Sequence, residues 1–464
     1  MTPRERIIQK EQLELYKRQR QLSKLTNIAA LPIFVLVLLL LAAFVDEIAT
    51  ATTGQVQSSV ITEFIVRPQK IDYNEGVAIF SGMSVFAGVT YVLAPFYKTL
   101  ADKLGRKPFL VINVAGMGLG MLLCLWSPNI VVYLVGSAFI AFFIQHDMQI
   151  IYLYEIVPAN RRATIYGIVK GLANLSIIAV PLLRTVAMKN DPELWRNVFA
   201  VPVLACVVIA ILIMLFAKET KMFLSQRINW LSKPYEERHP VKQEKKAKEN
   251  KGKTGIAVGM KHLFKEKQLL FILITCCCFS LVTSCFYGFT ESIMYDYGMK
   301  TEEITDALLF YPIIYALIIP ACGFLSDRIG RKKVIIISGA TAVLGFAAFN
   351  IAAMFHLPAC IVGILYGLYL GSWWATVDFT SMMSSESVPT HNRGSVAGAS
   401  SLVQVVAGGL GAVVTIVAPL LFQYIGFGYM VVTIPFVLIG LIVMALKVRE
   451  TKGVDLSAVQ YENS

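Results

Sequence analysis

Acidic residues beside a long apolar segment are the side chains of this sequence with the clearest chemical potential. Asp46 and Glu47 directly follow the apolar run 28–45. An ionisable group inside a bilayer costs about 2.5–3.5 kcal/mol on insertion scales, so it needs a partner or a function. A buried carboxylate can take up a proton near neutral pH, as proton coupling requires. Asp46 is therefore the first candidate proton site and Glu47 the second, and a paired structural carboxylate is the alternative for both.

Polar side chains continue beyond Asp46 at helical spacing. Thr50, Thr53 and Gln57 follow it at i+4, i+7 and i+11, so that on one helix all four share a face. We expect this face to line a water-filled cavity.

A second polar cluster lies in the apolar segment 130–156. His146 titrates nearest physiological pH and is a candidate proton relay to Asp147 or Asp46; a hydrogen-bonded structural histidine is the alternative. Gln145 and Gln149 flank it and are candidates for the wall of a cavity.

The second half of the chain adds candidates for contact with a solute. Aromatic rings can stack on a solute, although Trp is also a common membrane anchor. The candidates are Tyr287, Glu291, Trp373, Trp374 and Asp378. Lys170 and Arg184 lie near the ends of one apolar segment, where we expect them to extend toward the membrane surface.

The elements that position these residues are membrane spans. Of the 464 residues, 56% are hydrophobic and 16% are charged, fewer than the quarter typical of soluble proteins. Windows of about 20 apolar residues give twelve candidate helices. They cover 28–58, 76–97, 109–127, 130–156, 164–187, 195–217, 268–294, 303–324, 333–354, 358–386, 394–421 and 425–447.

The spans fall into two groups of six. We expect a basic N-terminal segment (1–24), a first bundle (25–217), a polar central loop (218–266), a second bundle (267–447) and a tail (448–464). The net charge of +12 lies in loops on one side of alternating spans rather than in a nucleic-acid-binding patch. The positive-inside rule then places both termini in the cytoplasm.

Three motifs occur once in each half, in the same order. LADKLGRK and LSDRIGRK place Asp102 and Asp327 225 residues apart. The segments YEIVPANRRA and SESVPTHNRG are 231 residues apart, as are the Glu-Thr-Lys segments at 219–221 and 450–452. Carboxylates and guanidinium groups at one membrane face can pair between helices in one conformation and separate in another, which makes a gate. We expect Asp102 and Asp327 to lie near helix N-termini, whose dipole favours an anion. Contact with lipid headgroups is the alternative for these loops. The gate candidates are Asp102, Arg106, Glu155, Arg162, Glu219, Asp327, Arg328, Arg331, Glu386, Arg393 and Glu450.

These motifs resemble those of the major facilitator superfamily, whose signature G-x-L-A-D-R-x-G-R-K is matched by GFLSDRIGRK at 323–332. The E-x-x-P-x-x-x-R segments and the closing VRETKGVDL look like its sugar porter branch. The resemblance implies an all-α membrane protein of twelve transmembrane helices in two pseudo-symmetric six-helix bundles. It also implies alternating access, with salt bridges at the cytoplasmic ends that hold the outward-open state.

The resemblance is weaker at the substrate site. The sugar porters carry a Gln-rich segment in span seven, and here that span contains no Gln. The Arg expected early in span four, the usual partner of the first-span Asp, is also missing. The gate motifs therefore match while the sugar site does not.

The sequence predicts a secondary active transporter of a small polar metabolite, a sugar or related solute, with protons as the coupling ion and symport favoured. A carrier of an organic cation or another non-sugar metabolite, and a non-transporting sensor with the same fold, remain alternatives. No catalytic set, metal-ligand spacing or cofactor motif is visible, so an enzyme is not expected. We expect a functional monomer in the lipid bilayer of the plasma membrane, with no nucleic-acid partner.

Overall fold

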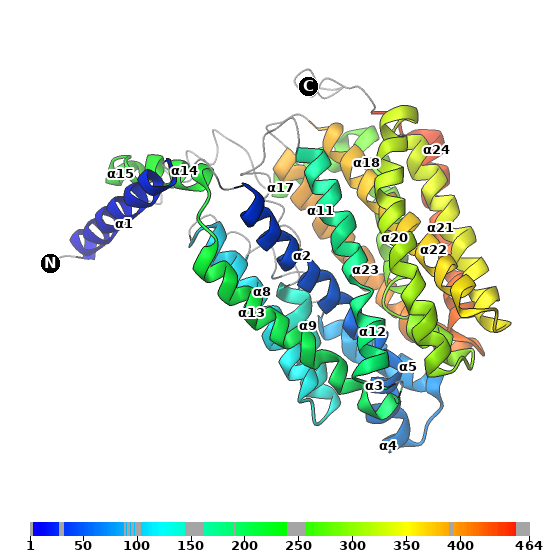
Figure 1. Ribbon diagram of the computed structural model, residues 1–464. Coiled ribbons are helices and arrows are strands. Elements are labelled where there is room, and N and C mark those ends of the chain that lie inside the picture. Colours follow the sequence, from blue (N-terminus) through cyan, green and yellow to red (C-terminus); the bar gives the residue numbers. More distant parts are fainter. Residues whose placement is uncertain are drawn as a thin grey trace.

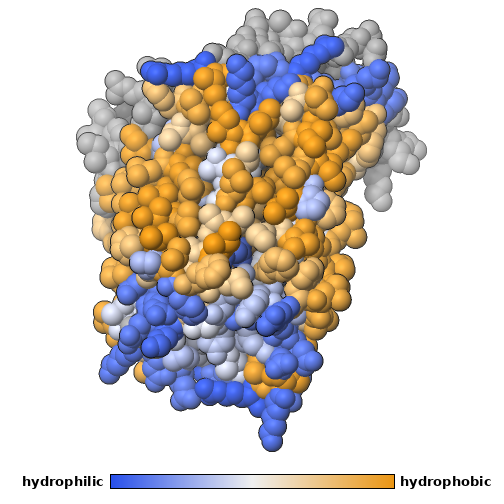
Figure 2. Space-filling view, turned by 90° about the vertical axis from the view of Figure 1, so that its right-hand side faces the viewer, coloured by the Kyte–Doolittle hydropathy of each residue, from blue (hydrophilic) through white to orange (hydrophobic). Residues whose placement is uncertain are grey.

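The structure is a computed structural model that describes residues 3–26, 32–87, 90, 93, 97, 104–143, 162–189, 191–238, 256–388 and 393–451. The described residues form helices and connecting turns and contain no strand. Ten of the described helices are long and apolar enough to cross a membrane, and the apolar helix Ile130–Phe143 is shorter. Figure 2 shows the matching surface, a hydrophobic belt between two hydrophilic ends.

The first half of the chain supplies most of the helices drawn in blue to green in Figure 1. They are α2 (Pro32–Gln55), α3 (Gln57–Ile61), the π-helical turn η1 (Thr62–Val66), α4 (Arg67–Gln69), α5 (Tyr73–Ser84), η2 (Val85–Ala87), α8 (Arg106–Leu125), α9 (Ile130–Phe143), α11 (Arg162–Ser176), α12 (Ala179–Val186), η4 (Pro192–Phe199) and α13 (Ala200–Phe216).

The second half supplies longer, less interrupted helices. They are α18 (Lys267–Phe286), α19 (Thr290–Asp296), α20 (Thr301–Ile329), α21 (Arg331–Met354), α22 (Ala359–Glu386), α23 (Arg393–Leu421) and α24 (Ile425–Lys447). The two halves contact each other where α11 and α12 pack on α20, and where α5 packs on α23.

The first span is broken near its end, contrary to the continuous helical face expected from Asp46 to Gln57. Helix α2 ends at Gln55, Val56 leaves helical geometry with φ −118° and ψ 11°, and α3 starts at Gln57. Thr50 and Thr53 stay on α2 with Asp46, whereas Gln57 belongs to a separate helix. The break also leaves the first N–H groups of α3 without partners inside the helix.

Four further helices lie at the end of the bundle that also carries the chain termini, which we call the terminal end (Figure 1). The central loop contributes α14 (Lys221–Leu231), α15 (Tyr235–Arg238) and α17 (Ile256–Lys265), and the N-terminal segment forms α1 (Pro3–Thr26). The composition of the central loop, dense in Lys and Glu, predicts a segment too polar to be buried, but both of its flanks contain buried residues. Phe223 and Leu224 are buried against Leu22 of α1, and Leu263 of α17 packs beside Val396 of α23.

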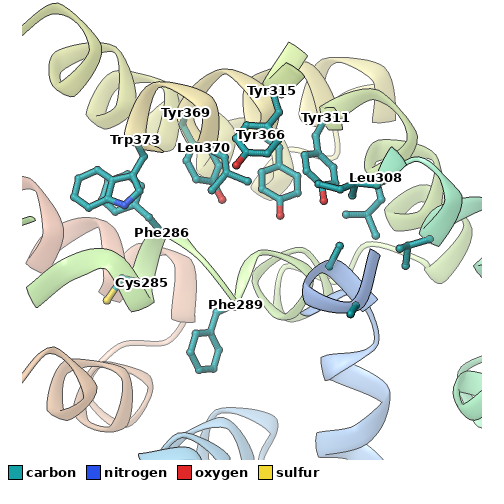
Figure 3. Close-up of a cluster of buried hydrophobic side chains, with 14 of the residues drawn as sticks. Cys285, Phe286, Phe289, Leu308, Tyr311, Tyr315, Tyr366, Tyr369, Leu370 and Trp373 are labelled. Atoms are coloured by element: carbon teal, nitrogen blue, oxygen red, sulfur yellow. The ribbon is translucent and has the colours of Figure 1, made fainter. Parts of the chain in front are cut away.

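The core of the second half contains a row of aromatic side chains between α18, α20 and α22 (Figure 3). The rings of Tyr311 and Tyr366 stack with centroids 4.1 Å apart, and Tyr369 follows one helical turn later. Their hydroxyl groups point in one direction, toward α19 and the end of α2 (Figure 3). This row brings hydroxyl groups of the second half to the boundary with the first half.

Candidate functional site

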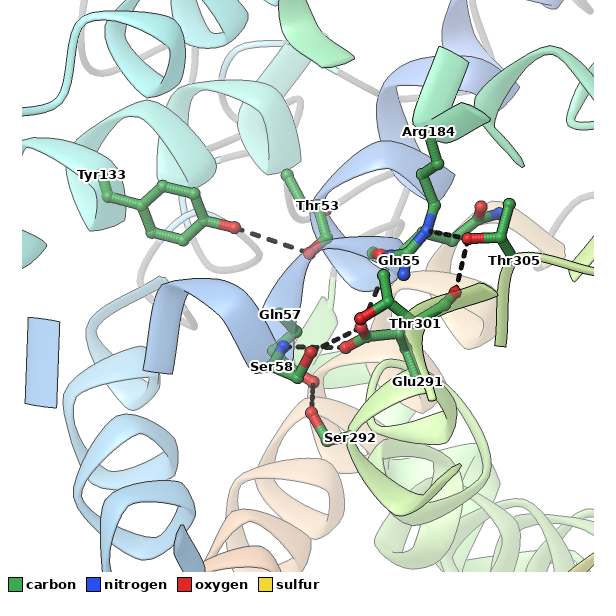
Figure 4. A network of polar contacts seen from close by, with 10 residues as sticks. All are labelled: Thr53, Gln55, Gln57, Ser58, Tyr133, Arg184, Glu291, Ser292, Thr301 and Thr305. Carbon is green, nitrogen blue, oxygen red and sulfur yellow. Dashed lines mark hydrogen bonds and ion pairs between the residues drawn. The ribbon is translucent and has the colours of Figure 1, made fainter. Parts of the chain in front are cut away.

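A buried carboxylate joins the two halves at the end opposite the termini, which we call the distal end. Glu291 of α19 accepts hydrogen bonds from the backbone N–H of Ser58 (2.7 Å) and from its hydroxyl (2.5 Å). The helix break at Val56 is what frees this N–H, so a helix start in one half is satisfied by a side chain of the other. Figure 4 shows Glu291 at the centre of the contacts.

Arg184 supplies the opposite charge. Its guanidinium group lies 3.4 Å from Glu291, donates to the hydroxyl of Thr305 (3.1 Å) and contacts the carbonyl oxygen of Gln55. Both side chains of the ion pair are only 1% exposed. The expectation that Arg184 reaches the membrane surface is therefore wrong, because partners inside the molecule satisfy its donors.

Two further hydrogen bonds between the halves lie around this ion pair. Ser292 donates to the side-chain oxygen of Gln57 (2.9 Å), and Gln55 donates to the hydroxyl of Tyr311 (3.1 Å). Gln57, a predicted cavity residue, is 7% exposed and lies in this contact rather than on an open wall. We call Gln55, Gln57, Ser58, Arg184, Glu291, Ser292, Thr305 and Tyr311 the distal lock.

A polar pocket lies beside the distal lock and includes Glu63, Arg67 and Tyr295 in its lining. Glu63 accepts hydrogen bonds from the guanidinium group of Arg196 at 2.7 and 2.9 Å. Burial raises the pKa of Glu63, but the hydrogen bonds from Arg196 and Trp195 and the charge of Arg196 outweigh it and hold that pKa below its ordinary value. Glu63 therefore carries a negative charge beside the lock at neutral pH.

The two proton-site candidates on α2 lie deeper in the first half. Asp46 is 2% exposed and lies near Cys206 of α13. Glu47 forms an ion pair with Lys170 of α11. Lys170 therefore has a partner within the bundle, which its position near a segment end does not reveal. Sequence spacing alone gave no sign that α2 and α11 meet here.

The hydroxyl candidates on α2 are engaged with their own helix. Thr50 donates to the carbonyl oxygen of Asp46 (2.9 Å), and Thr53 donates to that of Thr50 (3.1 Å).

The aromatic candidates of the second half divide between core and boundary. Trp373 is fully buried and stacks on Phe286 with ring planes 1° apart, so it belongs to the apolar core in this conformation. Trp374 is half-buried and packs edge-on against Tyr287. Asp378 is exposed. The tyrosine row described above was not among the sequence candidates, although the spacing of Tyr366 and Tyr369 places both on one helix face.

Several candidates cannot be placed. Gln145, His146, Asp147, Gln149, Asp102 and Glu155 lie outside the described residues. Arg162 and Arg393 begin α11 and α23, and their backbone alone is described.

The repeated Glu-Thr-Lys segments have the same structural role in both halves. Glu219 accepts hydrogen bonds from the N–H groups of Arg106 (2.9 Å) and Lys107 (3.3 Å), the first residues of α8. Glu450 does the same for Arg331 (2.8 Å) and Lys332 (3.1 Å) at the start of α21. Each carboxylate satisfies free N–H groups and the positive end of the helix dipole. Burial raises the pKa of Glu219.

The anion at the start of α21 is thus Glu450, not Asp327 as the turn motif predicts. Asp327 lies in the last turn of α20, is exposed and pairs with Arg331 at 2.8 Å. Arg331 also lies 3.4 Å from Glu386. These contacts stay within the second half. Arg328 lies over the ring of Phe324, and Arg106 lies over that of Phe223.

No group of three or more His, Cys, Asp or Glu side chains in the described part of the chain is arranged to hold a metal ion.

Comparison with known proteins agrees with this architecture. The family model described as Major Facilitator Superfamily matches residues 39–412. The chain is 24% identical over 385 residues to the glucose transporter GlcP of Staphylococcus epidermidis, covering 78% of this chain and 83% of that protein. It is also 24% identical over 149 residues to the class H tetracycline resistance protein of Pasteurella multocida, covering 32% and 36%.

Solved structures show the same fold. A D-xylose-proton symporter superposes with a TM-score of 0.69 at 16% identity, over 91% of this chain and 99% of that one. The partially occluded inward-open xylose transporter XylE from E. coli gives 0.64 at 15% identity, over 91% and 98%. Two pseudo-symmetric bundles of six helices account for the long helices described above. The chain belongs to the Major Facilitator Superfamily of membrane transporters.

Proposed function

We propose that this protein is a proton-coupled symporter of a small, neutral, hydroxyl-bearing solute, a sugar or a related compound. The observation that carries the proposal is the distal lock, a buried polar contact between two bundles that is satisfied only while their distal ends touch. Such a contact can form and break without exposing an apolar core, as alternating access requires. The xylose-proton symporter and the glucose transporter support the solute class.

The charges of the boundary favour a neutral solute over an organic cation. Glu291 is paired with Arg184, and Glu47 is paired with Lys170. Two of the carboxylates that would attract a cation are therefore neutralised. Tyr311, Tyr366 and Tyr369 are buried in this state, and the hydroxyl group of Tyr311 accepts a hydrogen bond from Gln55. When the distal ends separate, Tyr311 loses this partner, and its ring and hydroxyl group suit a polyhydroxylated solute.

Asp46 is the proton site in this proposal. It is buried on α2, which ends at Gln55 of the distal lock, so a change in its charge acts on an element that contributes to the lock. We take residues 25–217 and 267–447 as the two moving bundles. By the positive-inside rule the terminal end is cytoplasmic, so the distal lock closes the outer side of a plasma-membrane transporter.

The test is transient current on a solid-supported membrane that carries the reconstituted protein. A panel of sugars, polyols, organic acids and organic cations is applied to the wild type, to Asp46→Asn and to Glu193→Gln. The last variant is the matched control, since Glu193 is a surface carboxylate, 66% exposed.

A neutral sugar or polyol should evoke a current that carries positive charge with the solute. Asp46→Asn should lose this current while keeping solute counterflow, and Glu193→Gln should keep both. A current evoked only by organic cations would contradict the proposal of a neutral solute. Full coupled current in Asp46→Asn would overturn the proton site, and neither current nor counterflow for any solute would favour the sensor.

A further inference from the structure

Helix α1 is held at the terminal end by one of its faces. Glu14 accepts two hydrogen bonds from Arg227 of α14, each of 3.0 Å, and Leu22 packs against the buried Phe223. Arg18 donates to the carbonyl oxygen of Leu104 (3.2 Å). Burial raises the pKa of Glu14, but Arg227 and Arg18 outweigh it and leave that pKa below its ordinary value. The ion pair is therefore charged at neutral pH, and these contacts fix the rotation of α1.

The opposite face of α1 is mainly basic. At 100° per residue, a sector of about 140° on the side away from Glu14, Arg18 and Leu22 contains five cations and one acidic side chain, Glu5. Two apolar side chains lie in the same sector, Leu13 and Tyr16, which are 54% and 64% exposed. Its cations are all exposed: Arg6, Lys10, Lys17, Arg20 and Lys24.

The position of α1 directs this face toward the membrane. In Figure 1 helix α1 projects sideways beyond the bundle, and α14 and α15 lie above it. The face of α1 opposite α14 is therefore turned toward the membrane surface, where the transmembrane helices begin. A basic face with an aromatic and an aliphatic side chain is typical of helices that lie on anionic bilayers, where the cations contact headgroups and the apolar groups enter the interface.

We propose that the basic face of α1, opposite α14, binds the anionic lipid headgroups of the leaflet at the terminal end. Lipid bound to this face is connected to the turn before α8 through Arg18. The side chain of Arg18 donates a hydrogen bond to the carbonyl oxygen of Leu104, and both Arg18 and Arg106 lie over the ring of Phe223. The membrane surface thus holds α1 and α14 against one of the two repeated turns. The inference is independent of the transported solute.

The test uses the full chain in nanodiscs and an environment-sensitive NBD fluorophore on Tyr16→Cys. The background replaces Cys277, Cys278, Cys322 and Cys360, which are half-buried, by alanine. The matched control carries the label on Gln19→Cys, an exposed position on the flank of the same helix. Discs of phosphatidylcholine alone are compared with equal parts of phosphatidylcholine and phosphatidylglycerol.

Phosphatidylglycerol should shift the emission of the label at position 16 to the blue and raise its intensity about twofold, with a smaller change at position 19. The shift should be lost in Lys10→Gln/Lys17→Gln/Arg20→Gln. It should also be lost in 0.5 M NaCl, where the Debye length falls to about 4 Å from about 10 Å at 0.1 M. An emission at position 16 that is the same with and without phosphatidylglycerol would overturn the proposal. An acidic protein or a nucleic acid would then be the partner of this face. A shift that survives the triple substitution would overturn it as well. A single gel-filtration peak for each variant shows that the fold is intact, and the wild-type salt series tests the proposal without any charge substitution.

Discussion

At the scale of single residues, a buried ion pair joins the two halves of this protein. Arg184 and Glu291 are separated by 107 residues and meet with both side chains almost fully buried. Removing one member of such a pair costs about 3–5 kcal/mol, because the other is left as an uncompensated buried charge. The distal lock is therefore stable as a whole and sensitive to any change in its charge.

The buried carboxyl group of Asp296, beside the distal lock, should make the stability of the fold depend on pH. It accepts a hydrogen bond from the N–H of Ile425 (2.7 Å), and burial raises its pKa from 3.8 to about 6. Because the folded state binds this proton more tightly than the unfolded state, the stability that the group contributes is greatest below its ordinary pKa and is lost as the pH rises through about 6. Asp296→Asn keeps an acceptor for Ile425 and should raise the melting temperature by a few degrees at pH 7.5, with no gain at pH 4.

Thermal unfolding followed by intrinsic tryptophan fluorescence measures this difference at the two pH values. Asp306→Asn, which removes an exposed carboxylate of α20, is the control and should change the melting temperature at neither pH. An equal gain for Asp296→Asn at both pH values would contradict the prediction.

At the scale of elements, the repeated turns are built around glycines whose backbone conformation strains any other residue. Gly105 and Gly330 have φ of 112° and 103°, values that L-residues rarely adopt. A Cβ atom at Gly330 would lie 2.4 Å from a carboxylate oxygen of Glu450, and one at Gly105 would lie 2.2 Å from Glu219. The glycines thus let each carboxylate reach the start of the next helix.

Gly330→Ala should therefore destabilise the second half by about 1–3 kcal/mol through backbone strain, and further by displacing Glu450. The control is Gly409→Ala within α23, where an added Cβ meets no atom within 4 Å. That substitution should be neutral or stabilising, since Ala is a better helix former than Gly. The measurement is the melting temperature of each variant. An equal decrease in the melting temperature of both variants would contradict the prediction of backbone strain at Gly330.

At the scale of the whole molecule, the distal lock gathers several of the polar contacts between the halves. A further contact at the same end runs from the side chain of Asn74 to the carbonyl oxygen of Gln423 (2.9 Å). By contrast, the contacts of Arg331, a predicted gate residue, with Asp327 and Glu386 join elements of one half. The structure therefore represents a state that is closed at the distal end.

The distal closure can be measured by thiol labelling at Gln57→Cys, a position that is 7% exposed. Arg184→Gln leaves Glu291 buried and uncompensated, which should favour separation of the distal ends and speed the reaction of this cysteine with a membrane-impermeant maleimide by about tenfold or more. Gln69→Cys lies in an exposed turn at the same end and should react at one rate in both backgrounds. An unchanged rate at position 57 would show that the ion pair does not hold the halves together.

Much of the architecture could be predicted because membrane spans leave a strong signal in one dimension. Apolar windows gave the spans, and the repeated charges gave two equivalent halves. Residue roles were harder to predict. Arg184 lies near a segment end, where a snorkelling cation and a buried partner look the same in sequence. The order D-x-x-G-R-K likewise suggests Asp327 as the helix anion, while Glu450 is 123 residues away and fills that position.

The sequence by itself determined that this protein lies in a lipid bilayer, that it contains an internal repeat, and which superfamily it belongs to. Hydropathy and the order of motifs are local properties of the chain and can be read without the fold. Only the tertiary structure decided which charges meet. The pairing of Arg184 with Glu291, the helix break that frees the N–H of Ser58, and the basic face that α1 leaves open all depend on segments far apart in sequence. Hydrogen bonds and ion pairs act over a few ångströms in space, and separation along the chain says little about that distance.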